Sequence, residues 1–391
     1  MRPGTLTRRV GAGVSASIRA DEAAAEAARE ARDALEAAPV DLAFLFLSAE
    51  HRVGAEDALS AVERELAPGH LLGCVAQGVV GRDRELESGP GASVWAASLP
   101  EADIETFHSV AFGTDDGVAV SGFPLLDGAD LVAFIVDPFT FPAAGFLSKL
   151  NEEEDGAPLV GGLAAGSGEP DTQALFLGGE ILTEGAVGAV LRGAPVRTVV
   201  SQGCAPIGRD AVITAAEGNV VFELAGEQAL ERLKTDLGNL SAEEQRLAAN
   251  GGVLAGLVID ENRSEYRRGD YLMRGLLGID DDTGAIAIGE PVRVGQTLRF
   301  HVRDARSADA DLRENLAEAV DGDKIAGALL FTCNGRGTNM FSESDHDVRA
   351  VGETLAGDNL AGFFCAGEIG PVGGKPFLHG FTATLALFLQ D

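Results

Sequence analysis

The chain has few cysteines, and their spacing excludes the common cysteine-based sites. Cys74, Cys204, Cys333 and Cys365 lie far apart along 391 residues and form neither a CxxC pair nor a zinc-knuckle spacing. Each lies in an apolar or glycine-rich context, which favours reduced thiols over a disulfide framework. We therefore expect a protein of the reducing cytoplasm.

Long apolar runs are also missing. The longest, residues 42–47 and 131–136, are far shorter than the roughly 20 residues that a membrane-spanning helix needs. The amino terminus has early arginines but no apolar block behind them, so it does not have the pattern of a signal peptide. We expect no membrane insertion.

Lysine is scarce, and positive charge is outnumbered. Only four of the 30 basic residues are lysines, against 61 carboxylates, and the formal net charge is −31. Such a field repels phosphate backbones, so nucleic acid is not expected as a partner.

Three segments share one layout when the sequence is compared with itself. Each has a short apolar run, a helical stretch, a second apolar run ending in a glycine-rich bend, and a returning strand. Superposing the copies places Gly73 on Gly161 and on Gly362. A glycine there permits a positive φ or a close approach of two backbone segments. The copies begin at residues 41–48, 130–137 and 327–334.

These repeats predict an α/β fold of two intimately packed domains. We expect mixed β-sheets built from repeated strand–helix–strand–strand units, with the helices on the outer faces. The length supports two domains, because it exceeds the size at which one hydrophobic core usually stops growing.

The carboxy-terminal third contains ordered motifs that resemble a known family. YLMR, GQTLRFHVRDA, LLFTCNGRGTNMF, FFCAGEIGPVGG and FLHGFTATLALF together look like the FIST carboxy-terminal domain, and LLGCVAQGVVG, LVGGLAAGSG and GCAPIG resemble its amino-terminal domain. GCVAQGVVG departs from the family, in which Ser and Thr are more usual at the first bend. The resemblance implies an amino-terminal segment (residues 1–30), a FIST N-terminal domain (31–225) and a FIST C-terminal domain (226–391).

The resemblance also implies a sensory module that binds a small ligand, with amino acids or related carboxylate metabolites as the usual proposal. Relatives often carry an output domain, but this chain ends just after the last family strand, at Asp391. We therefore expect the signal to pass to a separate, unidentified protein partner.

The bend Cys333–Asn334–Gly335–Arg336–Gly337 is the centre of the predicted ligand site. It places a planar, always charged guanidinium on a bend whose N–H groups can face a ligand carboxylate. The alternative is that Arg336 pairs with an internal acid such as Glu368. Cys333 lies close enough to Arg336 for its thiol to be activated, although it also fits as a small apolar residue inside a strand.

The next glycine-rich bend supplies Gly367 and Glu368, whose carboxylate suits the ammonium group of an amino acid. Glu368 fits equally well as a turn cap or as a partner of Arg336. His379 and Arg274 complete the predicted set, with a structural hydrogen bond as the other interpretation of His379.

The sequence also bears on three alternative functions: haem binding, a role as an adaptor, and catalysis. Some FIST proteins are reported to hold haem, but no CxxCH sequence is present, so we expect no cofactor and keep haem as an alternative. A ligand-free interaction adaptor is the second alternative. Catalysis is not expected, since GPVGGKP is one residue short of a phosphate loop and no GxSxG or HExxH motif occurs. GAGVSAS near the start resembles half of a dinucleotide loop.

Overall fold

The computed structural model divides the chain into two compact units. The first comprises residues 1–200, 312–378 and 382–391, and the second comprises residues 201–311 and 379–381. The predicted boundary at residue 226 therefore falls inside the second unit. The structure describes residues 7–115, 117–153, 158–166, 168–170, 172–355 and 357–390.

The first unit contains the three predicted repeats, and the predicted α/β fold class is confirmed. In each repeat the first strand pairs in parallel with the strand after the helix and antiparallel with the returning strand. The repeats are β2 (Leu42–Ser48), α2 (Ala55–Leu66), β3 (His70–Ala76) and β6 (Ala92–Ser98); β9 (Leu131–Val136), α3 (Ala143–Glu153), β10 (Leu159–Leu163) and β13 (Ala186–Arg192); and β23 (Ile325–Cys333), α7 (His346–Leu355), β24 (Leu360–Cys365) and β27 (Thr382–Leu389).

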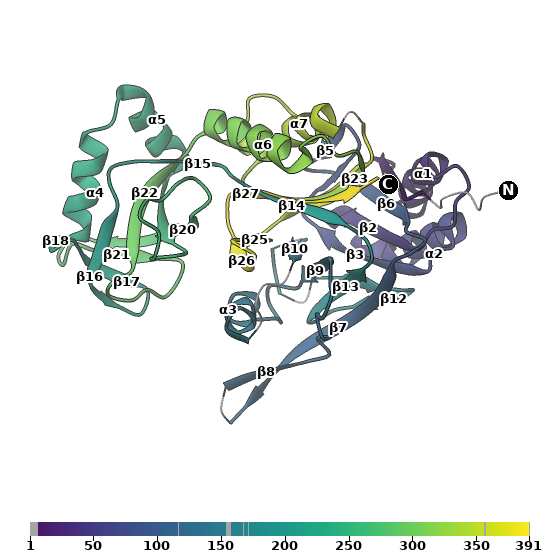
Figure 1. The fold of residues 1–391 in the computed structure, drawn as a ribbon, viewed down its shortest axis with the longest axis horizontal. Coiled ribbons are helices and arrows are strands. Elements are labelled where there is room, and N and C mark those ends of the chain that lie inside the picture. The colour runs from purple at the N-terminus through teal and green to yellow at the C-terminus, as the bar shows by residue number, and fades with distance from the viewer. Residues whose placement is uncertain are drawn as a thin grey trace. The chain divides into compact units, whose positions relative to one another are not determined.

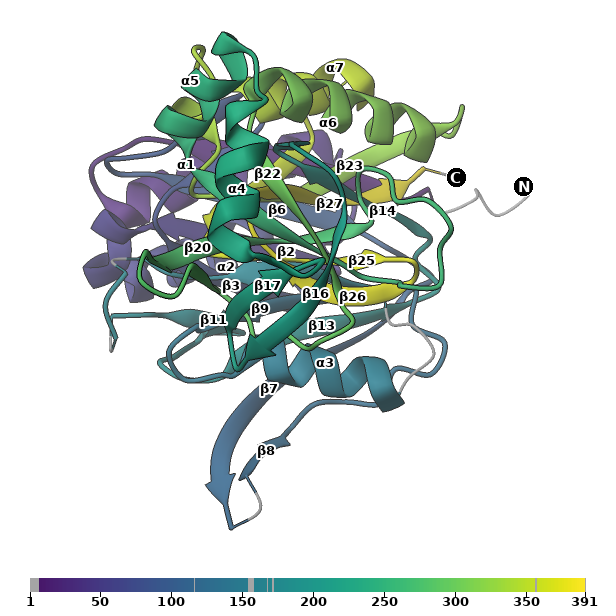
Figure 2. The ribbon, with the colours of Figure 1, turned by 90° about the vertical axis from the view of Figure 1, so that its left-hand side faces the viewer.

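Three mixed sheets are built on these repeats in the described part of the first unit. Their strand orders are β1-β6-β2-β3-β11-β12, β26-β25-β10-β9-β13-β7-β8 and β14-β27-β23-β24-β4-β5. The β7–β8 hairpin extends away from its sheet (Figure 2). The additional elements are β1 (Arg9–Ser15), α1 (Ala20–Ala34), a 3₁₀ turn (Ala49–Gly54), β4 (Val79–Gly81), β5 (Arg84–Leu86), β7 (Asp103–Thr114), β8 (Gly117–Ser121), β11 (Leu175–Leu177), β12 (Glu180–Leu182), β14 (Val196–Gln202), α6 (Ala305–Val320), a 3₁₀ turn (Gly337–Asn339), β25 (Glu368–Val372) and β26 (Lys375–His379).

Alternation along the strands gives each sheet an inner and an outer apolar face. In β2, Phe44 and Phe46 face a core shared by the three sheets, whereas Ala43 and Leu45 face α1 and α2. The other two sheets repeat this arrangement, with α3 over one and α6 with α7 over the other. Figure 1 shows these helices on the outer faces of their sheets, as the sequence predicted.

One glycine in each repeat allows two parallel strands to lie close together. A Cβ atom on Gly73, Gly161 or Gly362 would lie 1.8, 1.8 or 1.7 Å from a carbonyl oxygen of the neighbouring strand. No side chain fits at such a distance. The three glycines therefore occupy equivalent positions because the repeats have the same backbone geometry there. Each glycine lies inside its strand, ahead of the glycine-rich bend.

The amino-terminal segment belongs to this architecture. Gly11 and Gly13 of β1 lie against α1, where an added Cβ would be 2.0 Å from the carbonyl oxygens of Ala31 and Ala27. The glycines of GAGVSAS thus serve close packing of a strand on an alanine-rich helix. This packing requirement explains the glycines that make GAGVSAS resemble half of a dinucleotide loop.

The second unit is an antiparallel sheet that closes on itself. Its pairings run β22-β16-β17-β21-β20-β19 and return from β19 to β22, which leaves these strands without a free edge. None of the described helices of either unit combines the length and apolar character that a bilayer span requires. The elements are β15 (Cys204–Pro206), β16 (Ala211–Glu217), β17 (Val220–Leu224), β18 (Glu227–Gln228), α4 (Ala229–Gly238), α5 (Ala242–Gly251), β19 (Val253–Val258), β20 (Tyr271–Asp280), β21 (Ala285–Ile288) and β22 (Thr297–Arg303).

Replacing Gly362 tests the role of the repeat glycines. We expect Gly362→Ala to lower the free energy of unfolding by more than about 3 kcal/mol, because the new Cβ would overlap the Leu330 carbonyl. Gly145→Ala is the control: nothing lies within 4 Å of its added Cβ, and alanine favours the helix by about 0.5–1 kcal/mol. Urea unfolding measures both. Equal stability of the two variants would contradict this role.

Candidate functional site

The predicted ligand-binding bend follows β23 in the first unit. The Asn334 N–H donates to the Cys365 carbonyl at 2.8 Å, and the Arg336 N–H donates to the Cys333 carbonyl at 2.8 Å. Gly337 has a φ of 54°, and a Cβ there would lie within 2.8 Å of the Glu87 carboxylate. The bend is therefore tightly held, and it turns the Arg336 side chain into the protein.

Arg336 is completely buried and forms a two-point ion pair with Asp347. Its Nε donates to Oδ2 at 2.7 Å and its Nη2 donates to Oδ1 at 2.8 Å. The Thr332 hydroxyl also donates to Asp347 Oδ2, at 2.8 Å. Burial opposes ionisation of Asp347, but Arg336 outweighs it and holds the pKa of the carboxyl well below its usual range. The internal acid that holds Arg336 is thus Asp347, in place of the Glu368 named from sequence.

Two aromatic rings cover this ion pair. The Arg336 guanidinium lies 5.2 Å from the centre of the Phe341 ring, and His346 stacks on Phe341 at 3.5 Å with an interplanar angle of 8°. His346 Nδ1 is also 3.0 Å from Asp347 Oδ1. The rings exclude water from the charges, which strengthens their attraction.

Glu85 of β5 binds the start of α7. Its Oε1 accepts the N–H groups of Asp347 and Val348 at 2.7 and 3.0 Å, which satisfies donors at the start of the helix. Burial, and then the negative charge of Asp347, raise the pKa of Glu85 to about 8. At neutral pH this carboxyl is therefore largely protonated. Glu87, on the same side of the bend, accepts the Thr338 N–H at 2.9 Å.

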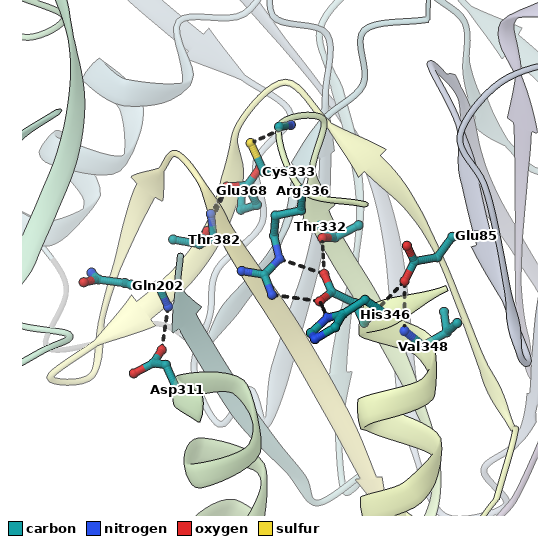
Figure 3. Close-up of polar contacts among 12 residues, drawn as sticks. Glu85, Gln202, Asp311, Thr332, Cys333, Arg336, His346, Val348, Glu368 and Thr382 are labelled. Carbon is teal, nitrogen blue, oxygen red and sulfur yellow. Dashed lines mark hydrogen bonds and ion pairs between the residues drawn. The ribbon is translucent and has the colours of Figure 1, made fainter. Parts of the chain in front are cut away.

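Glu368 lies on the other side of Arg336. It is completely buried, and its Oε2 accepts the Thr382 N–H at 3.1 Å and hydroxyl at 2.8 Å. Burial raises the pKa of Glu368 to about 8, although the hydrogen bonds from Thr382 and Cys333 and the charge of Arg336 lower it. Figure 3 shows two groups of side chains on opposite sides of Arg336: Cys333, Glu368 and Thr382 on one, and Thr332, His346 and Glu85 on the other.

One nitrogen of the Arg336 guanidinium lacks a partner in the described part of the chain. Its Nη1 is buried and has no hydrogen-bond partner among the described residues. A buried group of this kind costs about 1–3 kcal/mol when unsatisfied, and more when charged, so it needs an explanation. An acceptor atom of a ligand would provide the missing partner.

The other predicted site residues fall into two groups. Gly335 and Gly367 lie on the two bends, where the Gly367 carbonyl accepts the Leu163 N–H at 2.8 Å. Arg274 and His379 belong to the second unit, in which Arg274 forms an ion pair with Glu290 and His379 is buried. Asp347 and Glu85 were not predicted. Asp347 lies at the start of an amphipathic helix, and that position was the one available signal for it.

Models of the FIST family match nearly the whole chain. The FIST N domain matches residues 41–227 and the FIST C domain matches residues 229–371. An uncharacterized protein of Mycobacterium tuberculosis strain H37Rv, Rv0628c, is 45% identical over 386 residues, which cover 98% of this chain and all of the relative. An uncharacterized protein of Mycobacterium bovis, Mb0898c, is 43% identical over 98% of this chain and 99% of the relative.

The chain belongs to the FIST family. The resemblance found in the sequence is thereby confirmed, and FIST domains are sensory domains of signalling proteins. The candidate site draws on both parts of this FIST chain, because Glu85 lies in the FIST N match and Arg336, Asp347 and Glu368 lie in the FIST C match. Within the described residues, no cluster of three His, Cys, Asp or Glu side chains is arranged to hold a metal ion.

The two raised carboxyl pKa values predict a falling stability between acid and neutral pH. A carboxyl whose pKa is higher when folded stabilises the protein fully below its ordinary value of 4.5, and this contribution is lost as the pH rises to about 8. We expect the free energy of unfolding to fall by about 1.4 kcal/mol per pH unit for each group across this range.

Urea unfolding of Glu85→Gln and Glu368→Gln checks this, because each variant should remove one group's share of the slope. Glu153→Gln, which replaces an exposed carboxylate on α3, is the control. Slopes identical in all three variants and the parent would contradict the expectation.

The buried ion pair predicts a large cost for removing either partner. Asp347→Asn leaves the Arg336 charge buried without an anion, and we expect it to lower the free energy of unfolding by about 3–5 kcal/mol. We expect Arg336→Ala to destabilise the fold similarly, because it leaves the Asp347 carboxylate buried without its cation. Glu353→Gln breaks the exposed pair with Arg313 and should cost under about 1 kcal/mol. Similar losses for the buried and exposed pairs would show that burial does not set the cost of breaking the Arg336–Asp347 pair.

Proposed function

We propose that this FIST protein is a sensor that binds a small carboxylate metabolite beside Arg336, with an amino acid as the favoured class. The observation that supports this proposal most strongly is that the Nη1 group of the buried Arg336 guanidinium has no hydrogen-bond partner among the described residues. A ligand carboxylate provides the acceptor that this donor lacks. Because Asp347 already occupies the Nε–Nη2 edge of the guanidinium, the ligand carboxylate accepts from the N–H groups of Nη1.

Glu368 gives the site its preference for an ammonium group. The carboxyl is held in place by two hydrogen bonds from Thr382 and lies in the field of Arg336. It is largely protonated at neutral pH in the free protein, since burial raises its pKa to about 8. An ammonium group placed beside it favours the ionised form, so binding of an amino acid releases a proton from Glu368.

The α7 helix provides the route by which the binding signal is transmitted from the site. Arg336 holds Asp347, which is the second residue of α7, and Glu85 caps the same helix end. A ligand reaches the buried Arg336 only when the bend moves, and that movement is transmitted to α7. The outer surface of α7 lines a groove of about 570 Å³ together with the β4–β5 turn, and we assign this groove to the separate signalling partner.

Binding in this proposal changes no covalent bond of the ligand, so the protein acts as a sensor and has no enzymatic role. We also propose that it works in the cytoplasm. The reduced thiols of Cys74, Cys204, Cys333 and Cys365 support a reducing compartment.

Calorimetric titration with amino acids and with the matching carboxylic acids that lack the amino group tests the site. For the parent we expect binding of one or more amino acids, with release of about one proton per ligand at pH 7 when buffers of different ionisation enthalpy are compared. Glu368→Gln mimics the protonated carboxyl and preserves the fold, but it cannot ionise. We expect it to weaken amino acid binding at least about 30-fold and to leave the acids without an amino group unaffected.

The control is Arg313→Ala, which removes an exposed arginine of α6. Equal affinity of the parent and Glu368→Gln for every amino acid that binds would remove Glu368 from the site. Mass spectrometry of small molecules that co-purify identifies the starting set of ligands. If neither the co-purifying molecules nor the amino acids raise the apparent stability of the parent protein, the sensor proposal fails.

A further inference from the structure

Two cysteines end neighbouring parallel strands beside the ligand site. Cys333 of β23 is paired in register with Cys365 of β24. Phe331 and Phe363, two residues earlier on each strand, both face the shared core, so the two thiols leave the sheet on the same face. Adjacent strands lie about 4.8 Å apart. A disulfide requires Cα atoms roughly 4.4–6.8 Å apart, so the pairing is compatible with one.

The two thiols differ in accessibility. Cys333 is 9% exposed, whereas Cys365 and Cys74 are completely buried and Cys204 is 2% exposed. A small oxidant therefore meets Cys333 first. This order matters, because the more accessible member of a cysteine pair reacts with the oxidant and the less accessible member can resolve the product.

The Cys333 sulfur lies among polar and charged groups. The Gly335 N–H donates to its Sγ at 3.4 Å, and the fully buried Arg336 and the Glu368 carboxyl both interact with it. Positive charge and N–H donors stabilise a thiolate, which is the reactive form. The unpartnered Nη1 of the same buried arginine is a second, independent sign that this place receives an anionic or polar group.

We propose that Cys333 and Cys365 form a redox pair that reacts with a small hydroperoxide. The Cys333 sulfur attacks the peroxide: an S–O bond forms, the O–O bond breaks, and the leaving oxygen takes a proton from Glu368 to depart as an alcohol or water. Glu368 is then reprotonated by the proton lost from the Cys333 thiol. The sulfur is oxidised to a sulfenic acid and the peroxide is reduced.

The second step joins the two strands. The Cys365 sulfur attacks the sulfenic sulfur, an S–S bond forms, and the S–O bond breaks with loss of water that carries the Cys365 proton. Burial, and then the nearby Glu368 and the other two thiols, raise the pKa of Cys365 well above its usual range. A thiol is a weaker nucleophile than a thiolate, so this raised pKa slows the second step and gives dimedone time to trap the sulfenic acid.

Hydrogen peroxide is the probe for this pair. The folded parent is treated, the remaining thiols are alkylated after unfolding, and the peptides are measured by mass spectrometry. We expect Cys333 to be lost at least about tenfold faster than Cys204 and to appear joined to Cys365. With dimedone present, the Cys333 adduct replaces the disulfide.

Variants separate the two roles. Cys365→Ala should accumulate the dimedone adduct on Cys333 and form no disulfide, while Cys333→Ser should form neither, and Cys204→Ser should behave as the parent. Equal rates of oxidation at Cys333 and Cys204 would overturn the proposal, as would a parent that forms the sulfenic acid but never the Cys333–Cys365 bond. Each variant is also titrated with the same amino acids as the parent, so a failure of the redox pair and a failure of ligand binding are scored separately.

Discussion

The ion pair between Arg336 and Asp347 is the interaction on which the candidate site depends. A fully buried guanidinium is tolerated because an acid holds two of its nitrogens and an aromatic ring covers it. The same pair fixes the bend after β23 to the first turn of α7. With the Nε–Nη2 edge of the guanidinium committed to Asp347, the Nη1 group is left for a further partner, and this is where an acceptor group of a small molecule would bind.

The repeats explain why the site lies where it does. Three copies of one strand–helix–strand–strand unit face a common core, and each needs a glycine where its parallel strands come together. In the third copy the strand ends carry Arg336 and Glu368, which are both charged side chains placed against an apolar interior. Burial raises the pKa of Glu368 while the acid beside Arg336 keeps its low pKa, so two carboxyl groups near one arginine have opposite protonation states.

Much of this could be predicted from the sequence, and the remainder has physical reasons. The repeats were visible because Gly73, Gly161 and Gly362 have the same backbone requirement, which leaves a fixed residue at a fixed offset. The bends with Arg336 and Glu368 were visible because they interrupt apolar strands. Asp347 was not, since it lies in an acidic stretch where the sequence does not distinguish the carboxylate that turns inward.

Glu85 was beyond prediction because it reaches α7 from 262 residues away in the sequence. The compact units are not continuous in the sequence, for a related reason. The third repeat follows the second unit in the chain but packs on the core of the first two repeats, so the compact units cut across the sequence boundary at residue 226.

The protonation state of Glu368 with and without ligand tests the central claim most directly. Carbon-13 resonances of the glutamate carboxyl groups report ionisation, and Glu368→Gln assigns the relevant signal by its loss. We predict that Glu368 titrates near pH 8 in the free protein and is ionised at pH 7 once an amino acid saturates the site. A Glu368 signal that is already ionised at pH 6, or one that does not respond to a ligand that binds, would contradict the proposed site.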